Sequence, residues 1–263
     1  MADVEFKREK SVLWITLNRP EMMGAISNDM RAAMLDELRA ARTDLDVRAV
    51  VLTGRGRGFC SGADLSRPAG APAPERVVGA AREMMRTGMQ LLIRAIWELE
   101  KPVIAAVNGT AAGLGAHLAF ACDLIIAAAG ARFIEVFVRR GIAMDAVGGF
   151  LLPRVMPLAK AKELVFFGDA MTAEQAAEIG VVNRVVPAEE LEAAAREWAE
   201  RLAEGPTFAI GASKRLLNRG TESDLESCLE READLQSIVV ESDDAKEGMA
   251  AFRERRKPVF RGR

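Results

Sequence analysis

Two segments rich in small residues are candidates for binding a negatively charged oxygen. Residues 58–65 have the sequence GFCSGADL, and residues 108–117 have the sequence NGTAAGLGAH. Small side chains let a backbone approach a ligand closely, and the first N–H groups of a helix are unpaired at the positive end of its dipole. Each segment alone also fits an ordinary glycine-containing turn. Together they could direct two N–H donors at one oxygen, which is the arrangement of an oxyanion hole.

Predicted strands precede both segments and would position them. Continuous apolar runs predict buried strands before each segment, and the residues between 54 and 74 favour a long loop. Ser27 can cap a helix that follows the opening strands. The expected strands are 4–8, 12–17, 49–53, 102–107 and 124–127, and the expected helices are 29–42 and 75–100. This order predicts an α/β core, followed by a mostly helical region with one strand near 181–186 and a last helix over 244–256.

Composition and charge limit the kind of protein. The 263 residues are 50% hydrophobic, with 36 basic and 38 acidic side chains, which predicts a globular protein and gives no basic surface for nucleic acid. No signal peptide and no apolar window of about 18 residues is expected, so the chain is predicted not to span a membrane. Three cysteines without CxxC spacing predict reduced thiols and a cytoplasmic protein. The single histidine, His117, cannot easily build a zinc cluster or a Ser-His-Asp triad.

Five ordered segments resemble the signature regions of one enzyme superfamily. They are residues 17–20 (LNRP) with Ala25, residues 58–65, 106–123 and 141–154, and the tail 247–260 (EGMAAFRERRKPVF). In order and spacing they resemble the enoyl-CoA hydratase/isomerase (crotonase) superfamily over nearly the whole chain. The resemblance implies an α/β crotonase (ClpP-like) fold. Its spiral of ββα units is expected over residues 1–195, and a helical C-terminal region that builds homotrimers or hexamers is expected over 196–263.

The resemblance also implies which residues hold an acyl-CoA thioester, the expected partner. The backbone N–H groups of Ala63 and Leu114 match the family's oxyanion donors. The residues that match CoA-binding positions are Met23, Ala25, Asp64 and Leu65, and in many members the positions of Phe252 and Arg255 reach the CoA of a neighbouring subunit. No metal and no separate cofactor is implied, because CoA is part of the substrate.

The residues at the family's catalytic positions argue against hydration. Members that hydrate enoyl-CoA carry two glutamates, and the resemblance places His117 and Phe137 at those positions. Water addition needs one group that activates the water and another that handles the alpha proton, and neither glutamate is present here. Glu135 lies two residues before Phe137, so on a helix its side chain is expected to point about 200° away from that of Phe137 and to lie on the surface. His117 could donate a hydrogen bond near the acyl group, hold a water or simply pack, whereas Phe137 is expected to line the acyl pocket and Cys60 to be a packing residue.

Asp145 is the carboxylate that remains to move a proton. Its position resembles that of the single Asp base in several isomerases, above all the ring-opening isomerases of phenylacetate breakdown and Δ3,Δ2-enoyl-CoA isomerases. Shifting a double bond needs one base, which removes the alpha proton and returns it to the gamma carbon. Apolar neighbours are expected to exclude water and strengthen this base; they are Phe137, Ile142, Met144 and Val147. The alternative role for Asp145 is an N-cap of a helix that starts at Ala146.

Other hypotheses compete with an isomerase. A hydratase or lyase of the same family, or a CoA-ester-binding member without turnover, is the alternative. Dehalogenating relatives use an Asp at this place as a nucleophile, but they pair it with an aromatic donor such as Trp where this chain has Phe137. Naphthoate-synthase relatives use tyrosine, and the chain contains none. The acyl group is not predicted, since its pocket is expected to come partly from residues 66–74 and the helix over 75–100.

Overall fold

The computed structural model describes residues 2–66 and 77–263, and in this part of the chain the strands form two sheets. The larger sheet has the order β1-β2-β3-β5-β7-β10. Its first two strands form an antiparallel hairpin, and the other neighbours are parallel. The strands are β1 (Val4–Glu9), β2 (Val12–Leu17), β3 (Ala49–Gly54), β5 (Val103–Val107), β7 (Leu124–Ala128) and β10 (Arg184–Val186).

The smaller sheet consists of strands of three residues each. Its order is β4 (Gly58–Cys60), β6 (Thr110–Ala112), β8 (Arg132–Ile134) and β9 (Ala170–Thr172). Strands β4, β6 and β8 follow β3, β5 and β7 along the chain, so each ββ pair contributes one strand to each sheet before the next helix. This repetition confirms the spiral of ββα units expected from the resemblance.

Helices cover both faces of the larger sheet. On one face lie α1 (Asn28–Thr43), α3 (Met89–Trp97) and α4 (Leu114–Phe120), and on the other lies α8 (Leu191–Ala203). Because side chains alternate along a strand, Leu52 of β3 packs with the first group while Val51 packs with α8. The buried α8 residues on the second face include alanines, which let this helix lie close to the sheet. The Ser27 hydroxyl accepts a hydrogen bond from the Met30 N–H at 3.2 Å, which confirms the predicted helix cap.

The single helix predicted over 75–100 is wrong. The described part contains α2 (Ala80–Thr87) and α3, separated at Gly88, whose φ of −97° and ψ of −118° are not helical. A Cβ atom at Gly88 would overlap the Met84 carbonyl oxygen, so the backbone at this break has room only for glycine. Residues 67–76, which include most of the loop expected to line the acyl pocket, lie outside the described residues.

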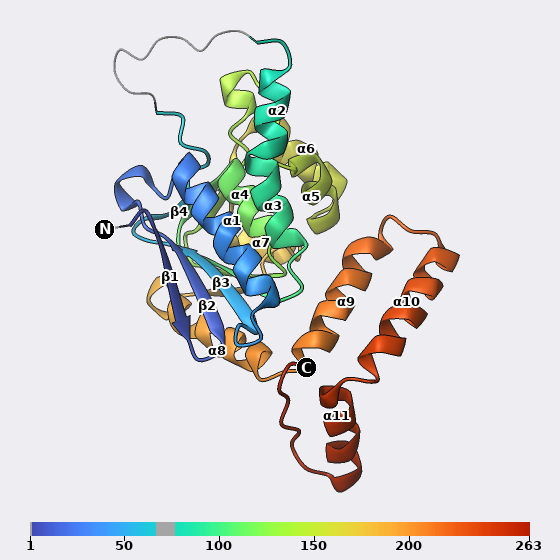
Figure 1. Cartoon of the computed structure of the whole chain (residues 1–263). Coiled ribbons are helices and arrows are strands. Elements are labelled where there is room, and N and C mark those ends of the chain that lie inside the picture. The colour runs from blue at the N-terminus through green and yellow to red at the C-terminus, as the bar shows by residue number, and fades with distance from the viewer. Residues whose placement is uncertain (1, 67–76) are drawn as a thin grey trace.

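The remaining elements complete the core and lead out of it. They are α5 (Gly148–Val155), α6 (Leu158–Phe167), α7 (Ala173–Glu178) and short 3-10 turns at Pro20–Met22, Val138–Arg140 and Ala188–Glu190. Beyond the core, α9 (Thr207–Gly220) and α10 (Leu225–Val239) form a pair of neighbouring helices, and α11 (Asp243–Glu254) lies well away from α4, as Figure 1 shows. The expected division after residue 195 falls inside α8, which packs on the sheet along its length. No helix in the described ranges is both long and apolar enough to cross a membrane.

Candidate active site

The two glycine-containing segments meet where β4 and β6 end. These strands are parallel neighbours, with Gly58 opposite Thr110 and Cys60 opposite Ala111. A Cβ atom on Gly115 would overlap the Cys60 carbonyl oxygen, and a Cβ atom on Gly62 would lie 4.0 Å from the Leu114 nitrogen. Gly115 permits its approach because it has no side chain, and Gly62, with a φ of 111°, has a backbone conformation that favours glycine.

The backbone N–H groups of Ala63 and Leu114 are available to a ligand. Within residues 2–66 and 77–263, neither donates a hydrogen bond to another protein atom. Leu114 is the first residue of α4, where N–H groups have no partner within the helix. On either side of Ala63, Ile26 pairs with Gly62 and Asp64 at 2.9 Å, so the strand-like pairing leaves the Ala63 N–H unused. Two unpaired donors on adjoining backbones can stabilise an oxyanion.

Residues that match CoA-binding positions lie in or beside the segment of residues 58–65. The Met23 carbonyl accepts a hydrogen bond from the Ser61 N–H at 2.9 Å, and Met23 itself has a φ of 52° in the left-handed region. Leu65, which follows the first segment, exposes 67% of its surface. The structure therefore brings Met23 and Leu65 to the edge that carries Ala63.

Arg19 links these two parts of the chain through a hydrogen bond to Ala25 and an ion pair with Asp64. The Arg19 Nη1 donates to the Ala25 carbonyl at 3.0 Å and to the Asp64 carboxylate at 2.8 Å. Hydrogen bonds from Ser66 and Arg19 lower the pKa of Asp64 to about 2, so its carboxylate stays ionised near neutral pH. Arg19 of the LNRP motif thus holds Asp64, near the end of the segment of residues 58–65, in place.

Asp145 does not cap a helix. The helix α5 begins at Gly148, and its N-cap residue is Val147, with no side-chain cap. The interpretation of Asp145 as an N-cap is therefore wrong. Among the described residues its partly exposed carboxylate makes no hydrogen bond or ion pair with the protein, which leaves it available to a ligand. Ile142, expected to help exclude water from Asp145, is itself 53% exposed.

Glu135 is a buried partner of His117, and its predicted surface position is wrong. It follows β8 directly rather than lying on a helix, and both side chains are 0% exposed. The His117 Nε2 lies 3.1 Å from the Glu135 Oε1 and 3.2 Å from Oε2. Sequence reasoning missed this contact because it assumed a helix at residue 135.

The ring of Phe137, a residue of the turn after β8, lies against the start of α4. Its ring stacks on the imidazole of His117, with centroids 5.6 Å apart, and is 8% exposed. A Cβ atom on Gly113, the residue before Leu114, would lie 3.3 Å from the Phe137 Cζ. Phe137 therefore forms an apolar surface beside the Leu114 donor, whereas His117 lies behind it, out of contact with solvent.

Cys60 has the character of a packing residue, as predicted. It is completely buried, and this burial raises the pKa of its thiol to about 12. A thiol of this kind stays protonated at neutral pH and is a poor nucleophile.

Phe252 and Arg255 are not brought to the other site residues within one chain. Both are exposed at the end of α11, which Figure 1 places well away from α4. Their expected contact with the CoA of a neighbouring subunit stays a prediction.

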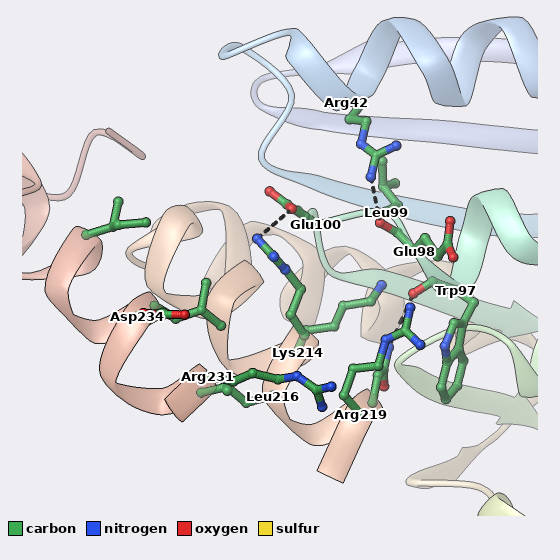
Figure 2. A pocket seen from close by; sticks show the side chains of 14 residues that line it. Arg42, Trp97, Glu98, Leu99, Glu100, Lys214, Leu216, Arg219, Arg231 and Asp234 are labelled. Carbon is green, nitrogen blue, oxygen red and sulfur yellow. Dashed lines mark hydrogen bonds and ion pairs between the residues drawn. The ribbon is translucent and has the colours of Figure 1, made fainter. Parts of the chain in front are cut away.

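A polar groove elsewhere on the molecule is separate from these residues. It lies between the end of α3 and the helices α9 and α10, where Figure 2 shows Arg219, Arg231 and Asp234. The Lys214 ammonium group in this groove pairs with the Asp123 carboxylate at 2.8 Å, so the positive charge of Lys214 is already balanced. None of the residues that match oxyanion or CoA positions lines it.

Comparison with known proteins decides the family. The family model described as enoyl-CoA hydratase/isomerase matches residues 7–263. The chain belongs to this family. A 1,2-epoxyphenylacetyl-CoA isomerase from Escherichia coli K12 is 40% identical over 259 residues, which cover 97% of each chain. This likeness confirms the predicted closeness to isomerases of the phenylacetate type.

Members of the enoyl-CoA hydratase/isomerase family with other names are also similar. A crotonyl-CoA hydratase from Syntrophomonas wolfei is 36% identical over 98% of this chain and 97% of its own. The crystal structure of an enoyl-CoA hydratase from Bacillus anthracis superposes with a TM-score of 0.91 at 32% identity, over 100% of both chains. The family and the crotonase fold are thus established, and the individual reaction is a separate question.

Proposed function

We propose that this enzyme shifts the double bond of an enoyl-CoA, with Asp145 as the base and the N–H groups of Ala63 and Leu114 as the oxyanion hole. One observation carries the proposal. Within residues 2–66 and 77–263 the Asp145 carboxylate has no protein partner, and the resemblance to hydratases places His117 and Phe137 where those enzymes hold glutamates. The likeness to a 1,2-epoxyphenylacetyl-CoA isomerase supports an isomerisation.

The proposed reaction needs one proton carrier. The Asp145 carboxylate takes a proton from the alpha carbon of a 3-enoyl thioester, and the electron pair of that C–H bond moves toward the thioester carbonyl. The resulting dienolate oxygen accepts hydrogen bonds from Ala63 and Leu114, each worth about 3 kcal/mol in the transition state. Asp145 then returns the proton to the gamma carbon, which leaves a 2-enoyl thioester and an unchanged enzyme.

This sequence of steps has no net oxidation or reduction and consumes no water. We therefore propose that CoA enters as part of the substrate and that no further cofactor takes part. The acyl chain or ring is left open.

A hydratase is the second candidate, and the likeness to a crotonyl-CoA hydratase favours it. Its difficulty is the missing pair of glutamates. Glu135 lies two residues before the second position, but it is buried against His117 and has no access to solvent. A water held by Glu135 would need both side chains to move.

An Asp145→Asn variant tests the proposal. Removing a general base is expected to lower kcat for double-bond migration by about 10²- to 10⁴-fold, while the affinity for a saturated acyl-CoA stays as in the parent. Asp36→Asn is the matched control, because Asp36 is an exposed residue of α1 outside the site. Migration of the double bond and hydration of crotonyl-CoA are followed in parallel by ultraviolet absorbance.

Full isomerase activity in Asp145→Asn would contradict the proposed base. Rapid hydration of crotonyl-CoA by the parent enzyme, without migration of a 3-enoyl double bond, would favour the hydratase.

We also propose that the C-terminal helices assemble the enzyme into homotrimers or hexamers. Leu225 and Leu229, one turn apart on α10, are 70% and 49% exposed in the single chain. Apolar side chains so exposed along one helix are typical of a surface that another subunit covers. Sedimentation velocity of the purified protein tests this proposal, and a monomer at micromolar concentration would contradict it.

A further inference from the structure

The buried pair of His117 and Glu135 has no part in the proposed proton transfer. The two residues come from α4 and from the turn after β8, and neither side chain is accessible to solvent. Burying two polar groups is costly, and a well-packed apolar pair is often at least as stable. A hydrogen bond between the His117 Nε2 and the Glu135 carboxylate does, however, hold the imidazole ring in one orientation.

The imidazole ring lies directly against the backbone that carries Asp145. A Cβ atom on Gly148 would overlap the His117 Cε1 and lie 2.5 Å from Nε2. Only glycine can therefore place its backbone on this ring. The Gly148 N–H donates to the Asp145 carbonyl at 2.9 Å, so the residue touching His117 also closes the turn that begins at Asp145.

The turn between Asp145 and Gly148 has an unfavourable backbone conformation. Ala146 and Val147 have φ angles of 44° and 69°, both in the left-handed region, and Val147 is β-branched. Such residues keep this conformation only when their surroundings hold them in it, and they are found preferentially at functional sites. The His117 ring is the buried surface on which the end of this turn rests.

We propose that His117, oriented by Glu135, is a positioning residue for Asp145. The ring supports Gly148 and thereby holds the strained turn, so that the Asp145 carboxylate faces the substrate beside the oxyanion donors. This inference rests on the proposed role of Asp145 as the base. It assigns to His117 and Glu135 no proton transfer with the substrate.

The test replaces both partners with apolar residues of similar size. His117→Leu/Glu135→Leu removes the aligned ring without leaving a buried charge, so the fold is expected to persist. We expect kcat to fall by about 10²-fold through misplacement of Asp145, with KM and the affinity for a saturated acyl-CoA unchanged. Lys214→Met is the control for loss of a buried charged contact, since Lys214 pairs with Asp123 and lines the groove beside α9, which contains none of the proposed oxyanion or CoA residues; it is expected to lower Tm but not kcat.

Glu135→Gln separates positioning from charge. Gln keeps an oxygen that can accept from the His117 ring, so a positioning role predicts kcat close to the parent value. A Glu135→Gln enzyme as slow as the double variant would overturn the inference, because loss of charge rather than of orientation would then be the cause. A folded double variant with parental kcat would overturn it as well.

These outcomes differ from failure of the proposed function. If Asp145→Asn abolishes migration while the folded double variant keeps its kcat, only the positioning role falls. If Asp145→Asn keeps full activity, the proposed base falls, and the positioning role falls with it.

Discussion

Leu114→Pro tests the oxyanion hole directly, because proline removes the backbone N–H. A proline inside a helix usually breaks a hydrogen bond, but Leu114 is the first residue of α4, where this N–H has no partner in the helix. Gly113 before it has no side chain to clash with the proline ring. The substitution therefore removes the proposed donor at little cost to the helix.

The expected size of the effect follows from the two roles of Leu114. Its side chain is 3% exposed, so shortening it should lower the free energy of unfolding by about 2 to 5 kcal/mol. Leu114→Ala makes a comparable cavity and keeps the N–H, which makes it the matched control. Loss of the donor should add about 3 kcal/mol to the activation barrier, which corresponds to a further fall in kcat of about 10²- to 10³-fold.

The assay compares kcat for double-bond migration in Leu114→Pro and Leu114→Ala, after circular dichroism has established that both fold. We expect similar unfolding midpoints in urea and similar affinity for a saturated acyl-CoA, but a much lower kcat in the proline variant. Equal kcat values in the two folded variants would refute the role of the Leu114 N–H.

Three further outcomes are expected. Hydrogen bonds accepted by the Asp64 carboxylate lower its pKa to about 2. The ionised carboxylate therefore stabilises the fold above about pH 4, and this contribution is lost as the pH falls through 2. In urea unfolding, Asp64→Asn should match the parent more closely at pH 2 than at pH 6. Gly115→Ala should lower the free energy of unfolding by about 3 kcal/mol and also reduce kcat, because its Cβ overlaps the Cys60 oxygen, whereas Gly220→Ala, which meets no atom within 4 Å, should be nearly neutral. Phe252→Ala should raise KM for the CoA ester without changing kcat, and an unchanged KM in steady-state kinetics would contradict its proposed contact with CoA.

Strands β2, β3, β5 and β7 of the larger sheet were predictable because each is a run of mostly buried apolar residues. Strands β3, β5 and β7 were expected within one or two residues of their observed bounds. The strands of the smaller sheet were not predicted, since three residues are too few to show a periodicity. Their position follows from pairing with neighbours, as when β6 aligns with β8 and the Gly113 N–H donates to the Ile134 carbonyl at 2.8 Å.

The partner of His117 could not be predicted for a similar reason. Glu135 is 18 residues away and meets His117 only because β8 lies beside β6, at the start of α4. A helix at residue 135 would point the Glu135 side chain to the surface, whereas the observed turn points it into the core.

Residue types and their spacing were enough to identify the family, the two glycine-containing segments and the candidate carboxylate, because each of these is a local pattern along the chain. Three findings needed the folded chain: Asp145 does not cap a helix, Glu135 is buried, and Gly148 packs on the His117 ring. Such contacts join segments whose approach depends on strand pairing and side-chain volume, and no local pattern of residues encodes them.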